Sequence, residues 1–149
     1  MQRRPFLKIA GGSMLALAAG GFSANLLAAN AEPVKVVYHM VDGIDQASRG
    51  LGNIRNHLRE MPDTRIVVVA HGEGINFLLE GAVDRSGKTF DDQVAALASQ
   101  GVEFRVCRNT LTARNIAPSR LVLEAKIVPA GVVEVARLQA REGFVYLRP

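Results

Sequence analysis

The chain has 149 residues, a formal net charge of +4 and a single cysteine. Three of its 18 basic residues lie within the first eight positions, so residues 32–149 carry 15 basic against 14 acidic side chains. This near-neutral balance, the absence of a Lys/Arg block and the few aromatic residues give no support to a nucleic-acid-binding protein. One cysteine also excludes an intramolecular disulfide.

The first 31 residues have the order of an export signal. The charged head Arg3-Arg4-Pro5-Phe6-Leu7-Lys8 is followed by a Gly/Ala-rich apolar run over 9–27 and by the small residues Ala29-Asn30-Ala31. Because the head is similar to the twin-arginine consensus, we expect a signal peptide over 1–31 that is removed before Glu32. The mature protein is then periplasmic and not inserted in the membrane. The alternative is an uncleaved anchor, which the glycine, serine and asparagine residues within the run disfavour.

The first part of the mature chain alternates strand and helix patterns. β-branched and aromatic residues predict a strand over 34–40, which Asp42-Gly43 ends. Apolar residues at steps of three and four predict a helix over 44–60 with one buried face. The continuous β-branched run within 65–70 is typical of a strand that is covered on both faces, and such strands belong to parallel sheets.

The same alternation continues to the end of the chain. We expect a short helix near 75–80, a helix from Thr89 to Gln100, and a strand over 102–106 that leads directly into Cys107. The last elements are helix 108–115, strand 125–128, helix 132–141 and strand 144–147. This order predicts one α/β domain over 32–149, a three-layer α/β/α sandwich around a mostly parallel sheet of about five strands.

Three chemically reactive side chains follow or end the first three predicted strands. His39 lies near the end of the first strand, His71 follows the second, and Cys107 follows the third. Because the carboxyl ends of parallel strands meet at one edge of a sheet, we expect these residues to lie together. Cys107 also precedes a helix and is followed by Arg108, and both features favour the thiolate. We therefore predict that Cys107 is reactive, with Arg108, His39 and His71 as supporting residues.

Other interpretations of these residues remain open at this point. A cysteine with histidines suits a metal site or a Cys-His nucleophile pair, but the chain has no CxxC, no HExxH and no closely spaced ligands. Cys107 could equally be a small, inert core residue, and the two histidines could serve only to bond turns. His57 lies off the apolar face of its predicted helix, so we expect it on the solvated surface.

Several segments together resemble one protein family. They are His71-Gly72 at the end of the second strand, 102–107 leading to Asn109-Thr110-Leu111, and 128–134 with Gly143-Phe144-Val145-Tyr146. On these segments the mature chain resembles the DsrE/DsrF-like (YchN-like) family. The resemblance implies a small α/β/α protein that forms a homo-oligomer, a trimer or a hexamer.

The resemblance also implies a function. Sulfur-trafficking members of the family carry sulfane sulfur as a persulfide on a cysteine placed as Cys107 is here, with no metal or organic cofactor. The expected partners are sulfur donor and acceptor proteins, small thiols or polysulfides, which the export signal would require to be periplasmic. The alternative is a non-enzymatic oligomeric module of the same fold that binds a small ligand or a metal ion at the carboxyl edge of the sheet.

Overall fold

The computed structural model describes residues 32–149, and the predicted export signal lies outside the described residues. The strands are β1 (Lys35–Met40), β2 (Arg65–Ala70), β3 (Glu103–Cys107), β4 (Ala125–Val128) and β5 (Val145–Leu147). The helices are α2 (Ile44–Glu60), α3 (Phe90–Ala98), α4 (Arg108–Ala113) and α5 (Gly131–Glu142), with the 3-10 helices η1 (Gly72–Leu78) and η2 (Pro118–Arg120). Within residues 32–149, no helix has the length and apolar character needed to span a membrane.

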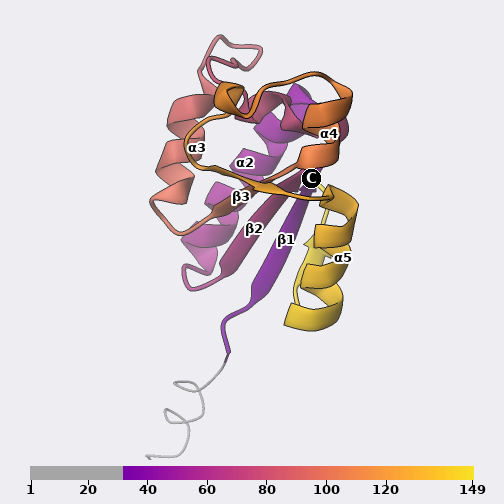
Figure 1. Cartoon of the computed structure of the whole chain (residues 1–149). Coiled ribbons are helices and arrows are strands. Elements are labelled where there is room, and N and C mark those ends of the chain that lie inside the picture. The colour runs from indigo at the N-terminus through magenta and orange to yellow at the C-terminus, as the bar shows by residue number, and fades with distance from the viewer. Residues whose placement is uncertain (1–31) are drawn as a thin grey trace, which may run out of the picture. The chain divides into compact units, whose positions relative to one another are not determined.

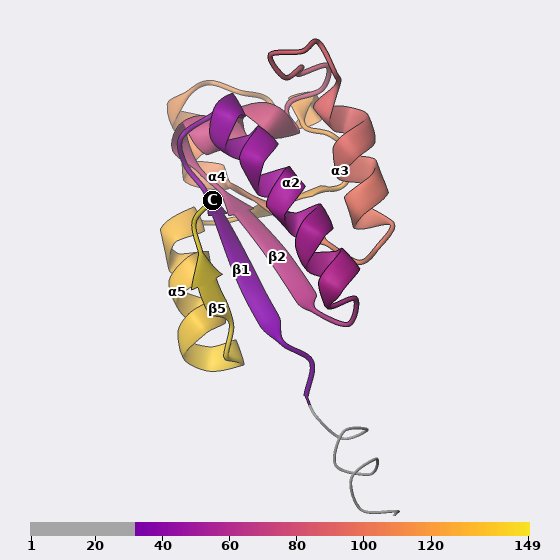
Figure 2. The same ribbon diagram turned by 180° about the vertical axis from the view of Figure 1, so that it is seen from behind.

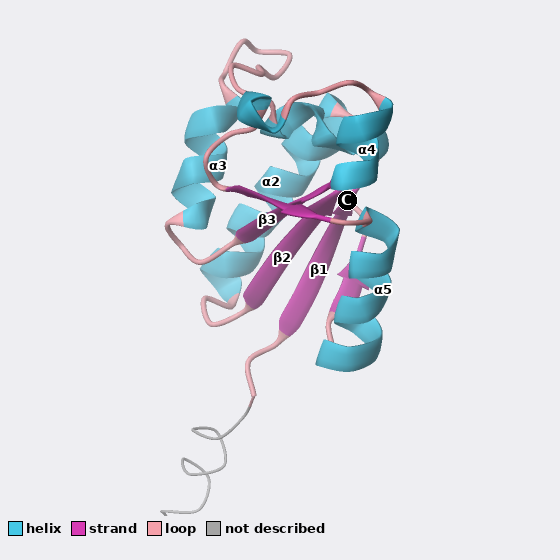
Figure 3. Ribbon diagram, in the orientation of Figure 1, coloured by secondary structure: helices cyan, strands magenta, loops and turns pink. Residues whose placement is uncertain are grey.

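The five strands form one sheet in the order β4-β3-β2-β1-β5, and every neighbouring pair is parallel. Figures 1 and 2, seen from opposite sides, show α2 and α3 on one side of the sheet and α5 on the other. Coloured by element type, the strands form a central layer between helices (Figure 3). The predicted three-layer α/β/α sandwich with a parallel sheet is therefore confirmed.

The face under α2 and α3 contains most of the hydrophobic core. Strand residues that point to this side, such as Val68 and Phe104, pack against Leu51 and Ile54 of α2 and against Val94 of α3. The rings of Phe77, Phe90 and Phe104 meet edge to face, with centroids 5.9 and 6.2 Å from the ring of Phe77. Such aromatic pairs stabilise a core beyond the apolar area that they bury.

The opposite face has a smaller apolar cluster and a single long helix. Val37, Val67 and Val69 of the strands pack against Val135 and Leu138 of α5 and against Phe144. This face also contains charged strand residues, because alternation along β3 points Glu103 and Arg105 toward α5. Within the part of the chain that the structure describes, α5 is thus held by apolar contacts and by ion pairs.

Two local differences from the predicted elements affect the site. The third strand runs one residue further than predicted, so that Cys107 is its last residue and caps α4. The helix expected over 75–80 is instead the 3-10 helix η1, which begins directly after His71. The reason is a close backbone approach: an added Cβ at Gly74 would lie 2.1 Å from the Met40 carbonyl oxygen. The chain must therefore turn tightly at this point, which local sequence patterns do not show.

Candidate active site

The structure brings His39, His71 and Cys107 together at the carboxyl edge of the sheet. The Nε2 atoms of His39 and His71 lie 2.7 Å apart. The backbone of Gly131, the first residue of α5, lies between His71 and Cys107. An added Cβ at Gly131 would lie 3.1 Å from the Cβ of His71 and 3.2 Å from that of Cys107. The register of the parallel strands places the residues as neighbours, since Met40 pairs with Ala70 and Ala70 with Val106.

Donors near the Cys107 sulfur counter the effect of its burial on the thiol pKa. Its side chain is 5% exposed, and this burial acts to raise the pKa of Cys107. The backbone N–H of Gly131, the N–H and hydroxyl of Thr110 and the N–H of Asn109 act in the opposite direction and hold the pKa of Cys107 below its usual value. The sulfur therefore lies where the first turns of α4 and α5 converge, and their N–H groups favour the thiolate.

Thr110 is held in place by a hydrogen bond from the turn that follows β2. Its Oγ1 accepts a hydrogen bond from the backbone N–H of Gly72 at 3.0 Å, which leaves the hydroxyl hydrogen for the sulfur of Cys107. Gly72 has a φ of 57°, a left-handed conformation that favours glycine and orients this N–H. The turn after β2 thus helps to orient a donor to the thiolate at the end of β3.

The two histidines form a chain of polar contacts with a tyrosine. His39 Nδ1 lies 2.9 Å from the Tyr146 hydroxyl, while its Nε2 faces His71. Burial lowers the pKa of His39, and the charges of His71 and Arg148 lower it further, against an opposing contribution from Asp42. Burial and Arg148 likewise lower the pKa of His71. Both rings are therefore neutral near pH 7, and the pair can accept one shared proton.

Three arginines that lie near Cys107 in the sequence differ in their exposure and contacts. Burial acts to raise the pKa of Cys107, and hydrogen bonds from Gly131, Thr110 and Asn109 lower it. Arg108 is exposed. Arg105 forms ion pairs with Glu103 and Glu134, and Arg114 donates to the Gly72 carbonyl and to Asn76. The N–H groups at the start of α4 therefore favour the thiolate, and support from Arg108 stays a prediction.

Three contributors to this site were not identified from the sequence. They are the N–H of Gly131, the hydroxyl of Thr110 and the phenol of Tyr146. The rule that placed Cys107 at the carboxyl edge also applies to β4, whose end leads to the first turn of α5, so Gly131 could have been found. The side chain of Tyr146 reaches His39 because β5 pairs with β1, and the two residues in contact are 107 positions apart in the sequence.

A metal site has no support in the described domain. Within residues 32–149, no group of three His, Cys, Asp or Glu side chains is placed to hold a metal ion. Both nitrogens of His39 are engaged, Nε2 with His71 Nε2 and Nδ1 with the Tyr146 hydroxyl.

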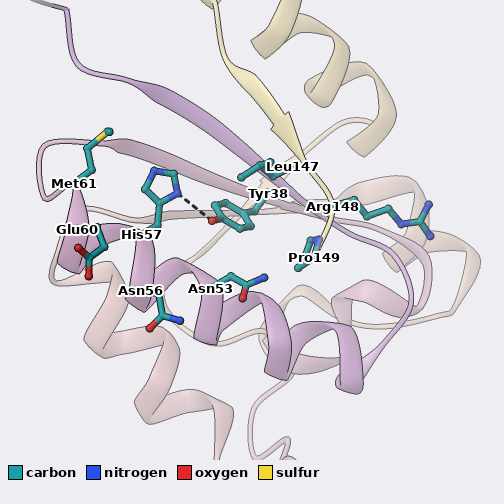
Figure 4. A pocket seen from close by; sticks show the side chains of 9 residues that line it. All are labelled: Tyr38, Asn53, Asn56, His57, Glu60, Met61, Leu147, Arg148 and Pro149. Carbon is teal, nitrogen blue, oxygen red and sulfur yellow. Dashed lines mark hydrogen bonds between the residues drawn. The ribbon is translucent and has the colours of Figure 1, made fainter.

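A separate pocket of about 480 Å³ lies on the other face of the sheet, between α2 and the C-terminal residues. Figure 4 shows Tyr38 and His57 in its lining, joined by a hydrogen bond of 3.1 Å between the Tyr38 hydroxyl and His57 Nδ1. The expectation that His57 is a solvated surface residue is therefore wrong, because its ring is partly buried against Tyr38. Cys107 does not line this pocket.

Comparisons with known proteins agree with this architecture. The model of the DsrE/DsrF-like family matches residues 13–148. The chain is similar to the solved structure of MTH1491, a protein of unknown function from Methanobacterium thermoautotrophicum. The two are 32% identical with a TM-score of 0.69, and the match covers 78% of this chain and 99% of that one. The YchN protein from E. coli is 15% identical, with 80% of this chain and 100% of that chain covered and a TM-score of 0.63. No curated protein matches the chain.

Proposed function

Since the chain belongs to the DsrE/DsrF-like family, we propose that it is a sulfur-trafficking protein that carries sulfane sulfur as a persulfide on Cys107. The observation that carries this proposal is the environment of the sulfur, in which the N–H groups of Gly131, Thr110 and Asn109 and the Thr110 hydroxyl stabilise the thiolate. Thiolate is the nucleophile in exchange reactions between thiols and sulfur–sulfur bonds.

The reaction that we propose is an exchange without net oxidation. The Cys107 thiolate attacks the outer sulfur of a donor persulfide, R–S–SH. A bond forms between Sγ and that sulfur, and the donor's S–S bond breaks to release R–S⁻. In the second step an acceptor thiolate attacks the outer sulfur of Cys107–S–SH, and the Cys107 thiolate leaves. The same donors that stabilise the thiolate before the first step stabilise it again as the leaving group of the second.

The His39–His71 pair supplies a proton acceptor and donor beside this exchange. It is neutral near pH 7, it shares a contact of 2.7 Å, and His71 lies across Gly131 from Cys107. A neutral pair can take the proton of an incoming thiol and return it to the departing thiolate. His71→Ala is expected to slow sulfur loading several-fold without abolishing it, since the thiolate itself is retained.

A second candidate function is a binding module in which Cys107 has no chemistry. The low exposure of its side chain, 5%, favours this alternative, because a donor must reach the sulfur through a small opening. The two candidates differ in one respect that can be measured. A carrier acquires sulfur at this one position, whereas a module with an inert cysteine does not.

The test is the intact mass of the purified protein after incubation with inorganic polysulfide and removal of the excess. We expect the mass to rise by one sulfur atom or more and to return to its original value on treatment with a reducing thiol. Cys107→Ser keeps a side chain of similar shape and should gain no sulfur. Absence of sulfur on the folded wild-type protein, or equal gain by Cys107→Ser, would overturn the proposal.

We also propose that the mature protein acts in the periplasm. This proposal rests on the order of charged, apolar and small residues over 1–31. Replacement of Arg3 and Arg4 with lysine should leave the precursor in the cytoplasm, as measured by fractionation and precursor size. Normal export of the lysine variant would remove the twin-arginine assignment.

A homo-oligomer, a trimer or a hexamer, is the third part of the proposal. Besides family membership, it is supported by Val132 and Val133, which begin α5 with exposed fractions of 60% and 62%. Exposed apolar side chains on a small domain gain stability when a second subunit buries them. Light scattering at micromolar concentrations should show a trimer or a hexamer, and a monomer throughout that range would contradict this expectation.

A further inference from the structure

The position of α5 matters for the thiolate, because Gly131 in its first turn supplies one of the N–H donors to Cys107. The apolar contacts of α5 with the sheet come from later turns, through Val135 and Leu138. The first two helix residues that could pack, Val132 and Val133, face solvent instead. The backbone brings this turn near the end of β3, since Val128 at the end of β4 pairs with Cys107. A side-chain contact between β3 and α5 holds it there.

That contact is an ion pair between Arg105 and Glu134. A guanidinium nitrogen of Arg105 donates to Glu134 Oε1, and the two side chains are only 12% and 11% exposed. A second nitrogen of Arg105 donates to Glu103 Oε2 at 2.8 Å, which fixes the guanidinium on the strand. Glu134 also accepts from Arg137 at 2.9 and 3.1 Å. Hydrogen bonds from Arg137 and then Arg105 hold the pKa of Glu134 below its usual value despite burial.

The ion pair and the thiolate contact join the same two elements. Arg105 lies two residues before Cys107 on the same face of β3, and Glu134 lies three residues after Gly131, about one turn along α5. We propose that Arg105 and Glu134 are positioning residues that hold the first turn of α5, and with it the Gly131 N–H, against the Cys107 sulfur. This inference deepens the proposed function and rests on it only in treating the thiolate as the reactive species.

The other charged groups near this pair act elsewhere. Arg65 from β2 lies 3.6 Å from Glu103 and 3.5 Å from Glu142, and Lys126 from β4 lies 3.8 Å from Glu103. Arg137 joins Glu134 to Glu142 within α5 itself. On the side of the sulfur, His71 is neutral near pH 7 and Arg108 is exposed. Among the described residues, Arg105–Glu134 is therefore the ion pair that links β3 to the first turns of α5.

The test compares Glu134→Gln with Glu103→Gln by the pH midpoint of Cys107 alkylation in the folded protein. Each variant removes one carboxylate that pairs with Arg105, but Glu103 lies on β3 and reaches only the last turn of α5, through Arg65. Loss of a nearby negative charge alone would lower the thiol pKa. Loss of positioning weakens the hydrogen bond from the Gly131 N–H to the thiolate, and this raises the thiol pKa. The two explanations thus predict opposite signs for Glu134→Gln.

We expect Glu134→Gln to raise the midpoint by about half to one pH unit, which is a roughly three- to tenfold lower thiolate fraction below the midpoint. Glu103→Gln should leave the midpoint unchanged or lower it slightly. Glu134→Asp, which keeps the charge but shortens its reach, should also raise the midpoint, and it decides the matter if Glu134→Gln does not fold. A folded Glu134 variant whose midpoint is unchanged or lower would overturn the inference.

A double-mutant cycle with Gly131→Ala adds a second criterion. The new methyl group would lie 3.1 Å from His71 Cβ and 3.2 Å from Cys107 Cβ and should displace the first turn of α5. If Glu134 acts through the Gly131 N–H, the two changes together should raise the midpoint little more than one alone. Full additivity would contradict the inference. Because none of these midpoints requires sulfur loading, failure of the proposed function on polysulfide treatment would be recognised separately.

Discussion

The two faces of the sheet differ in the interactions that hold their helices. The face under α2 and α3 is packed with aliphatic and aromatic side chains, including the contact of Phe77, Phe90 and Phe104. The face under α5 has a small aliphatic cluster next to the ion pairs of Arg105, Glu103 and Glu134. Apolar burial is non-directional and contributes most of the stability, whereas ion pairs and hydrogen bonds fix distances.

A domain this small can therefore combine stability with a reactive group. Burying apolar surface on one face stabilises the sheet without specifying where any single N–H points. The other face can then use directional contacts to hold the first turn of α5 against Cys107. The comparison therefore predicts that substitutions on the two faces affect two different measured quantities, the free energy of unfolding and the thiol pKa.

The largest effect on stability is expected from Phe104→Ala. Phe104 is fully buried on β3 and points away from Arg105 and Cys107. Truncation should lower the free energy of unfolding by about 3–5 kcal/mol, as for other buried phenylalanines. The thiol pKa should stay as in the wild type under conditions where the variant is folded. Denaturant unfolding measures the free energy of unfolding, and the pH midpoint of alkylation measures the thiol pKa. A large shift of the midpoint in Phe104→Ala would contradict the separate roles of the two faces.

Thr110→Val is expected to change the thiol pKa more than the stability. This change keeps the shape of the side chain but removes the hydroxyl that accepts from Gly72 and donates to Cys107. The free energy of unfolding should fall by only about 1–2 kcal/mol, while the thiol pKa rises by up to about one unit. Thr110→Ser keeps the hydroxyl and serves as the control, with a pKa near that of the wild type. A low pKa in Thr110→Val would show that this donor is not needed.

A smaller effect concerns stability in acid. The pKa values of His39 and His71 are lowered in the folded state, so the unfolded chain binds more protons as pH falls below the ordinary histidine value of about 6.5. The folded protein should therefore lose stability as pH falls through this region toward the folded-state pKa values. His39→Gln removes one of the two titrating rings and should flatten the decline between neutral and mildly acidic pH. An unchanged slope of stability against pH would contradict the burial and charge effects described for the pair.

The sequence predicted the fold well where the pattern is local. The spacing of apolar residues in α2 and the β-branched run of β2 predicted both elements to the residue. The 3-10 form of η1 could not be predicted, since it depends on the approach of Gly74 to the Met40 carbonyl across 34 positions. Local patterns do not report such contacts.

The same distinction applies to the site. The carboxyl-edge rule correctly places His39, His71 and Cys107 together, because it follows from the parallel sheet alone. It could not show that Arg105 is neutralised by Glu103 and Glu134, or that Tyr146 reaches His39. These contacts depend on how α5 and β5 dock. Of the two features predicted from sequence to favour the thiolate, helix N–H groups lower the pKa of Cys107 in the structure, and the contribution of Arg108 stays a prediction.

Whether the first turns of α4 and α5 stabilise the thiolate is tested most directly by the pH dependence of alkylation at Cys107. It is measured in the folded protein and in the urea-unfolded chain. The chain has one cysteine, so every adduct reports on this thiol. The midpoint, unlike the absolute rate, does not depend on the limited access to a side chain that is 5% exposed. The account predicts a midpoint in the folded protein clearly below that of the unfolded chain, which should lie near the free-cysteine value of about 8.5. A folded-state midpoint equal to or above the unfolded one would contradict the claim that the first turns of α4 and α5 stabilise the thiolate.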